Sequence, residues 1–296
     1  MPEQESTTSD LPIRIPFVGS PDARPAASCF DRETDEILAR LDSCGDLVHS
    51  ELEAYRNSMP SDGAEASRDC LLSVVIPVYN EENTIARVIS RVTSLPLNTQ
   101  LVIVDDCSTD GTRELLKKLE GLSSVKLVLK EQNAGKGAAL RTGFEHATGD
   151  YVVIQDADLE YDPSDIPKLI QPLIKGDADI VYGSRFIGEE QQDESWIHRA
   201  GNAVLTGASN LFSGLSLTDM ETCYKAFNRE VLEGLQITQD RFGIEPELTA
   251  KLARRGYRFV EVPISYNSRG YSEGKKIGIR DLFNAVYCIG RYGITD

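Results

Sequence analysis

Two aspartates separated by one small residue, Asp156-Ala157-Asp158, follow an apolar stretch that ends at Gln155. Carboxylate oxygens are hard ligands that suit Mg²⁺ or Mn²⁺, and such a site keeps coordination positions for substrate phosphates. Glu160, two residues further on, is placed to supply a third oxygen. Aspartate is also common in ordinary turns at strand ends, so the pair alone decides little. Its meaning depends on the polar groups that the fold brings to the same place.

Other polar segments also stand at the ends of apolar stretches: Pro77, Tyr79 and Glu81; Asp105 and Asp106; Lys136 between Gly135 and Gly137; and Arg185. One carboxylate of the Asp105-Asp106 pair can accept a hydrogen bond from a nucleobase ring N–H while the other fixes the turn. Tyr79 and Glu81 can hold ribose or base in the same way. Lys136 begins a predicted helix, and the free backbone N–H groups at a helix N-terminus favour binding of an anion such as a diphosphate. Together these groups favour a nucleotide-diphosphate site with a divalent cation.

Two common nucleotide-binding signatures are absent. No Gly-x-x-x-x-Gly-Lys-Ser/Thr loop surrounds Lys136, which argues against a P-loop enzyme. No Gly-x-Gly-x-x-Gly segment follows the first apolar run, which argues against a dinucleotide-dependent dehydrogenase.

The elements that must position these residues alternate regularly from residue 71 onward. We predict strands at 71–77, 100–105, 126–129, 151–155 and 179–182, and helices at 81–94, 109–120, 135–147 and 163–174. This alternation predicts an α/β fold with a mostly parallel sheet and helices on both faces. The carboxyl ends of such strands meet at one edge, where ligands bind. After Tyr182 the rhythm breaks, and we predict helices at 198–212, 244–255 and 279–289 and a strand at 257–263.

Residues 1–70 differ in composition from residues 71–296, which form the predicted catalytic domain. The first segment holds 15 acidic and 6 basic residues, a net charge of −9, within a chain of net charge −16. Its first 30 residues have the composition of a disordered segment. Residues 35–55 show helical periodicity, as a helix packed on its own domain or as one that docks a partner or membrane.

The bulk properties exclude some classes of partner. A net charge of −16 argues against nucleic-acid binding, which needs clustered Lys and Arg. Six Cys without a Cys-x-x-Cys motif suit a reduced, cytoplasmic setting. No apolar run reaches the roughly 20 residues that span a bilayer, so we expect at most a peripheral membrane contact. Ile279, Leu282, Phe283, Val286 and Tyr287 form a stripe that either docks a membrane or packs on the domain.

Read together, the loops resemble family 2 of the glycosyltransferases, which have the GT-A fold. The resembling segments run from residue 71 to about 276 and comprise 75–81, 104–111, 133–137 and 155–160. Within the family the chain is most similar to dolichyl- and polyprenyl-phosphate sugar synthases, through residues 182–186, 219–227, 260–263 and 269–275.

The resemblance implies a role for each motif residue. The donor nucleotide, a GDP- or UDP-sugar, would lie among Pro77, Tyr79, Glu81, Asp105, Asp106, Lys136, Gly137, Asp156 and Ala157. Asp156, Asp158 and Glu160 would face Mg²⁺ or Mn²⁺. Arg185 and Arg199 would lie near the acceptor phosphate. From the residues themselves, Arg269 and Lys275 are further cations that we expect at this phosphate, and Lys225 is another cation available to position it.

The expected chemistry is an in-line displacement that inverts the anomeric carbon. A lipid-phosphate acceptor is already an anionic nucleophile and needs cationic positioning rather than a base. A hydroxyl acceptor on a glycan, protein or small molecule would need a base, and the available acids are Asp219, Glu221, Glu245 and Glu247. A third reading is a sugar-nucleotide-binding module without turnover.

Overall fold

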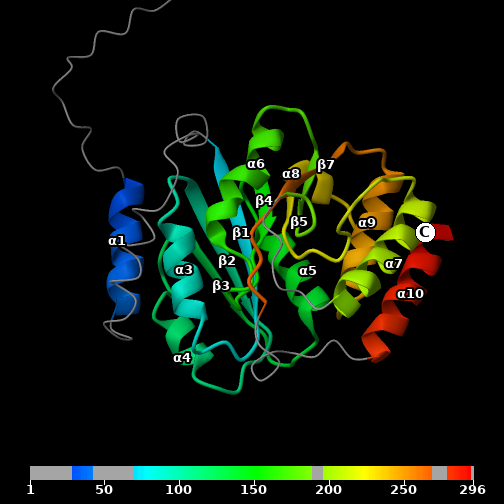
Figure 1. The fold of residues 1–296 in the computed structure, drawn as a ribbon. Coiled ribbons are helices and arrows are strands. Elements are labelled where there is room, and N and C mark those ends of the chain that lie inside the picture. The colour runs from blue at the N-terminus through cyan, green and yellow to red at the C-terminus, as the bar shows by residue number, and fades with distance from the viewer. Residues whose placement is uncertain (1–28, 43–69, 189–195, 269–278, 295–296) are drawn as a thin grey trace, which may run out of the picture.

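The computed structural model describes residues 29–42, 70–188, 196–268 and 279–294. Its centre is a seven-stranded sheet in the order β3-β2-β1-β4-β6-β5-β7 (Figure 1). The strands are β1 Leu71–Val78, β2 Asn98–Asp105, β3 Val125–Leu129, β4 Tyr151–Ile154, β5 Ile180–Ser184, β6 Lys225–Asn228 and β7 Phe259–Pro263. All neighbouring pairs are parallel except those that β6 makes with β4 and β5. The expected α/β class with a mostly parallel sheet is confirmed.

Helices cover both faces of the sheet, as expected, and the strand residues alternate between two hydrophobic cores. Val74 and Ile76 of β1 belong to the core that packs against α3 (Ile85–Thr93) and α6 (Ile166–Ile174), whereas Val75 faces the opposite core. The opposite core takes in α5, α7, α9 and α10, which span Lys136–His146, Trp196–Ser213, Ile244–Arg254 and Ile279–Ile294. The short helices α4 and α8 span Thr112–Lys117 and Arg229–Leu232, and a 3-10 turn at Pro163–Asp165 precedes α6.

The strand β6 was not predicted, and it determines how the two halves of the sheet meet. It has only four residues and begins with a lysine, so it lacks the apolar run that marks the other strands. Because β6 runs antiparallel to both neighbours, β4 and β5 still point the same way. The segments that follow β1, β2, β4 and β5 therefore emerge at one edge, and the chain enters β6 from that edge.

The first described helix, α1, spans Cys29–Asp42 and so starts before the expected position at residue 35. Ile37 and Leu41 are almost fully buried in the core shared with α3, and α1 lies beside α3 in Figure 1. The Arg40 guanidinium donates hydrogen bonds to the carbonyl oxygens of Lys118 (2.9 Å) and Glu120 (3.3 Å). This helix therefore packs on the α/β domain. Residues 29 and 30, the end of the expected disordered stretch, belong to α1. Residues 1–28 and 43–69, with the rest of that stretch and of the expected helix, lie outside the described residues.

Candidate functional site

Three strands of the sheet are followed by a non-glycine residue with a positive φ angle. These residues are Asn80 after β1 (55°), Cys107 after β2 (66°) and Leu159 after β4 (62°). Such conformations cost about 1–3 kcal/mol each and persist only where surrounding contacts hold them. Here the Asn80 side-chain oxygen accepts a hydrogen bond from the Thr109 amide at 2.8 Å, and the Asn80 amide donates to Ser108 Oγ at 2.9 Å. The turns after β1 and β2 are thus fastened to each other.

The residues expected around the nucleoside lie in these two turns. Pro77 and Tyr79 are half-buried, and Glu81 Oε2 accepts a hydrogen bond from Thr84 Oγ1 at 2.7 Å. Asp105 is fully buried and accepts a hydrogen bond from Arg113 Nε at 2.6 Å. Their contact with a nucleotide stays a prediction.

Asp106 fastens the turn after β2 to the segment that leads into α5. Its carboxylate accepts hydrogen bonds from the amides of Ala134 (3.1 Å) and Gly135 (2.6 Å), and pairs with Lys130 at 2.5 Å. Asp105 holds the turn after β2 itself, because its carboxylate accepts a hydrogen bond from the Ser108 amide at 3.1 Å. Both aspartates therefore bind backbone, Asp105 in its own turn and Asp106 in the next segment.

Gly135 and Gly137 allow the start of α5 to approach the chain at residues 239–240. Gly135 has φ 100°, and a Cβ added there would lie 2.5 Å from the carbonyl oxygen of Asp240. A Cβ on Gly137 would lie 2.2 Å from the carbonyl oxygen of Gln239. Gly137, expected at the donor, is buried by this packing. The two glycines thereby fix the backbone on both sides of Lys136.

Lys136 projects from the start of α5 into a cluster of acidic and sulfur groups. Its Nζ lies 2.8 Å from Asp156 Oδ1, 2.7 Å from Cys223 Sγ and 3.9 Å from Glu245 Oε1. Burial alone would lower the pKa of Lys136, but the negative charge of Asp156, with Cys223 and Glu245 behind it, raises the pKa well above its usual value. Lys136 therefore keeps its positive charge beside the first aspartate of the Asp-x-Asp pair.

The turn after β4 presents Asp156 and Asp158, both partly exposed, on either side of Ala157. Ala157, also expected at the donor, has its side chain in the hydrophobic core, 4% exposed, so only its backbone can face a ligand. Leu159, in the left-handed region, turns the chain so that the Glu160 amide donates to Asp158 Oδ1 at 3.1 Å.

The Glu160 carboxylate accepts a hydrogen bond from the Tyr266 hydroxyl at 2.9 Å. No group of three or more acidic, His or Cys side chains that could hold a metal is gathered within the described ranges. The two aspartates nevertheless suit Mg²⁺ or Mn²⁺, because both are partly exposed hard oxygen donors and these ions take further ligands from water and phosphate. The role of Glu160 as a third ligand stays a prediction.

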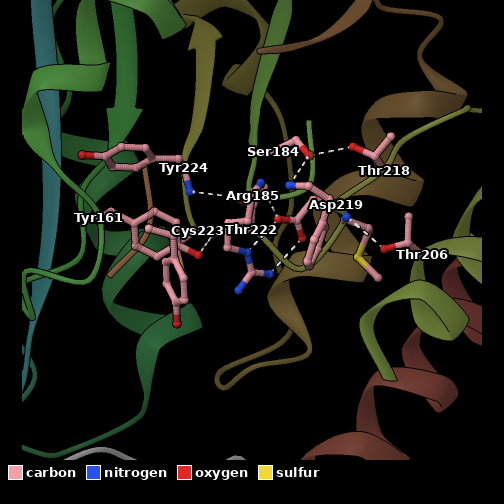
Figure 2. A network of polar contacts seen from close by, with 12 residues as sticks. Tyr161, Ser184, Arg185, Thr206, Thr218, Asp219, Thr222, Cys223 and Tyr224 are labelled. Carbon is pink, nitrogen blue, oxygen red and sulfur yellow. Dashed lines mark hydrogen bonds and ion pairs between the residues drawn. The ribbon is translucent and has the colours of Figure 1, made fainter. Parts of the chain in front are cut away.

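Arg185 follows β5 and is clamped by a buried aspartate (Figure 2). Its Nε and Nη2 lie 2.7 and 2.8 Å from the two oxygens of Asp219, which is fully buried, and its backbone amide donates to the same carboxylate at 3.2 Å. Glu261 of β7 in turn accepts hydrogen bonds from the amides of Thr218 and Asp219. The direction of Arg185 is therefore set by groups from three separate segments.

The four cations expected at an acceptor phosphate divide into two pairs. Arg199 on α7 is exposed, and its Cζ lies 5.8 Å from the centre of the Phe186 ring, while Arg185 Cζ lies 5.5 Å from the same centre. The two arginines are thus gathered around one aromatic ring. Arg269 and Lys275 lie outside the described residues.

Lys225 is not an acceptor cation, and the suggestion that it is was wrong. It is fully buried, and its Nζ donates to the carbonyl oxygen of Met220 at 3.0 Å, to that of Thr222, and to Glu245 Oε2. As the first residue of β6, it lies inside the sheet rather than on the surface.

Two of the acids expected as bases for a hydroxyl acceptor already bind other groups of the protein. Asp219 holds Arg185, and the buried carboxylate of Glu247 accepts hydrogen bonds from the amides of Thr238 and Gln239 and pairs with Lys251. Glu221 is half-buried, and its Oε1 atom is buried with no hydrogen-bond partner among the described residues.

The pKa of Glu221 is raised to about 7, first by burial and next by the charge of Glu245. Lys225 and Arg185 act in the opposite direction, and Asp219 adds to the rise. Glu221 is therefore a carboxyl group that titrates near neutral pH.

Some residues of the site carried no signal that assigned them a role. Cys223 reaches Lys136 because it precedes the unpredicted β6, and Tyr266 reaches Glu160 from 106 residues away. Tyr161 joins the same region by accepting a hydrogen bond from the Cys223 amide at 3.2 Å (Figure 2). These contacts could have been predicted only from the order of the strands in the sheet.

Comparisons with known proteins show the family and the fold of the chain. Residues 73–235 match glycosyl transferase family 2. The undecaprenyl-phosphate 4-deoxy-4-formamido-L-arabinose transferase of Aeromonas hydrophila is 32% identical over 223 residues, covering 73% of this chain and 66% of that protein. The dolichol-phosphate mannosyltransferase of Pyrococcus furiosus is 33% identical over 213 residues, 70% of this chain and 59% of that protein. The chain thus spans slightly less than two thirds of these curated relatives.

Among solved structures, glucosyl-3-phosphoglycerate synthase from Mycobacterium tuberculosis in complex with UDP superposes with a TM-score of 0.57 at 25% identity, covering 83% of this chain and 85% of that one. The same enzyme with Mn²⁺, UDP and phosphoglyceric acid gives a TM-score of 0.58 at 23% identity, a likeness that shows the fold alone. The expected GT-A fold is confirmed. This chain belongs to glycosyl transferase family 2.

Proposed function

We propose that this protein transfers a sugar from a nucleoside-diphosphate donor to a polyprenyl phosphate, with inversion at the anomeric carbon. The observation that carries the proposal is the pairing of two charge environments at one sheet edge: acidic residues after β4, and arginines after β5 and on α7. Relatives at 32% and 33% identity named for undecaprenyl-phosphate and dolichol-phosphate support the choice of acceptor.

On the donor side, Asp156 and Asp158 would hold Mg²⁺ or Mn²⁺. When bound, the cation would offset the negative charge that develops on the departing diphosphate. Lys136 lies beside this pair and carries a charge that the leaving group can use. The turns that carry Tyr79, Glu81 and Asp105 form the adjoining edge, where we place the nucleoside of a GDP- or UDP-sugar.

On the acceptor side, a phosphate monoester is already an anion, so its oxygen needs no base. It needs to be brought to the sugar against the net negative charge of the chain. Arg185, oriented by Asp219, and Arg199, across the Phe186 ring, supply guanidinium donors that match phosphate oxygens. We propose that these two arginines bind the acceptor phosphate.

The chain meets its lipid substrate, in this proposal, by peripheral attachment at the cytoplasmic face of a membrane. Within the described ranges, no helix combines the length and apolar character needed to cross a bilayer. Phe283, Val286 and Tyr287 of the predicted stripe on α10 are exposed, so for these three the alternative of packing on the domain is wrong. Leu211 on α7 is 80% exposed, and α7 packs beside α10 (Figure 1).

The test is a two-stage assay. A thermal-shift panel of GDP- and UDP-sugars with Mn²⁺ identifies the donor, since a ligand at 100 times its dissociation constant stabilises by about 2.7 kcal/mol. The donor is then incubated with a short-chain polyprenyl phosphate, and with phosphoglyceric acid as a hydroxyl-bearing control. We expect a lipid-linked sugar phosphate from the first acceptor only. Product from the hydroxyl acceptor alone would overturn the lipid assignment, and donor binding without any product would favour a binding module.

A further inference from the structure

The ammonium group of Lys136 lies on the aspartate that is expected to bind the metal. Its Nζ is 2.8 Å from Asp156 Oδ1 and 3.1 Å from Oδ2, so it approaches both oxygens of the carboxylate. A divalent cation bound through either oxygen would lie close to this positive charge. The two charges repel, and little water screens the repulsion because the side chains of Lys136 and Asp156 are each only 16% exposed.

The backbone of Lys136 cannot move aside to make room. It is flanked by two glycines that pack against the carbonyl groups at 239–240, and the Asp106 carboxylate holds the amide of Gly135. The side chain, in contrast, is long and has rotatable bonds. Any relief of the repulsion must therefore come from rotation of the side chain to another anion.

We infer that Lys136 acts as a resident counter-ion that guards Asp156 until the donor arrives. In the absence of nucleotide, its ammonium group neutralises Asp156 and keeps the affinity for divalent cations low. A nucleoside diphosphate supplies new anionic oxygens, draws the ammonium group towards itself, and releases Asp156 to bind the metal. This inference rests on the proposed function, because it assigns an order to the events at the same donor site.

The inference predicts strong coupling between metal and nucleotide. Coupling of this kind is reciprocal: the factor by which nucleotide tightens metal binding equals the factor by which metal tightens nucleotide binding. Cys223 and Glu245 also contact the Lys136 ammonium group, but they attract it less strongly than Asp156 does, because Glu245 is already paired with Lys225. The energy for moving Lys136 must therefore come from the diphosphate.

The experiment measures Mn²⁺ binding to the full chain by electron paramagnetic resonance, first alone and then with UDP or GDP. We expect Lys136→Met to bind Mn²⁺ without nucleotide about 10- to 150-fold more tightly than the unaltered protein, the equivalent of one charge-assisted hydrogen bond. We also expect nucleotide to enhance Mn²⁺ binding much less in this variant. Equal Mn²⁺ affinity in the two proteins without nucleotide would overturn the inference.

Two controls separate the specific effect from others. Lys168→Met removes the same charge from a side chain that is 55% exposed and pairs with Asp165, and it should leave Mn²⁺ binding unchanged. If it gains as much as Lys136→Met, the effect is one of net charge and the inference fails. Adding Asp156→Asn to Lys136→Met should abolish the gain, and persistence of the gain would equally overturn it.

Failure of this inference about Lys136 can be distinguished from failure of the proposed function. If no nucleotide binds, the proposed function fails, yet Mn²⁺ binding without nucleotide still decides whether Lys136 guards Asp156. Thermal unfolding shows whether Lys136→Met is folded, and Lys136→Gln, which keeps a polar end, serves in its place if it is not.

Discussion

The pair formed by Arg185 and Asp219 allows a structural role for the arginine to be separated from a role in binding the acceptor. Asp219 is fully buried, and two of its contacts come from the Arg185 guanidinium at 2.7 and 2.8 Å. Removing the arginine alone leaves an uncompensated buried charge, which costs about 3–5 kcal/mol of folding stability. We therefore expect Arg185→Met to be strongly destabilised.

The double variant Arg185→Met/Asp219→Asn should recover most of this stability, because the buried carboxylate is gone while the asparagine oxygen can still accept the hydrogen bond from the backbone amide at residue 185. Urea unfolding of the two single variants, the double variant and the unaltered protein measures the coupling between the residues. The same four proteins are then compared in the transfer reaction with varied polyprenyl phosphate.

If Arg185 binds the acceptor phosphate, kcat/KM for the acceptor falls by about 10- to 150-fold in the single variant and stays low in the double variant, although the fold is restored. Binding of the nucleoside diphosphate should change little in either. Recovery of acceptor-dependent turnover in the double variant would refute the reasoning, because it would show that Arg185 serves only to neutralise Asp219. Loss of nucleotide binding instead would assign Arg185 to the donor site.

Three further outcomes are expected. Asp158→Asn should remove divalent-dependent turnover with little change in the unfolding midpoint, because Asp158 lies in a partly exposed turn; full activity of the unaltered protein in EDTA would contradict the metal assignment. Glu221 should make the free energy of unfolding depend on pH, because its pKa is raised from 4.5 to about 7 in the folded chain. Its protonated form stabilises the fold; this contribution is complete below pH 4.5 and is lost as the pH rises through 7. Glu221→Gln should flatten the dependence of the unfolding free energy on pH between 5 and 8, and an unchanged slope would count against this assignment. Ile37→Ala and Leu41→Ala should each lower the unfolding free energy by about 2–5 kcal/mol, whereas undiminished stability of a chain that starts at Ser67 would show that α1 is dispensable.

Much of the fold was readable from local patterns. A buried parallel strand needs a continuous apolar run, and the strands at 71–78 and 98–105 each contain one, at 74–78 and 101–104, so they were predicted to within a few residues. The polar segments that interrupt these runs must then emerge at one edge of the sheet. The strand at residues 225–228 was missed because four residues beginning with a lysine satisfy no such pattern, and its existence depends on pairing with β4 and β5.

Local sequence patterns were enough to identify the residues that could do chemistry and the strand ends near which they lie, because strand and turn signals act over a few neighbouring residues. The partners of these residues depend on how distant segments pack. Lys136 meets Asp156, Arg185 meets Asp219, and Lys225 is buried against Glu245, at separations of 20, 34 and 20 residues. These contacts follow from the strand order and from the insertion of β6 between β4 and β5. The residue type sets the charge of a side chain. Whether that charge contacts solvent, substrate or an opposite charge depends on segments that pack together only in the folded chain.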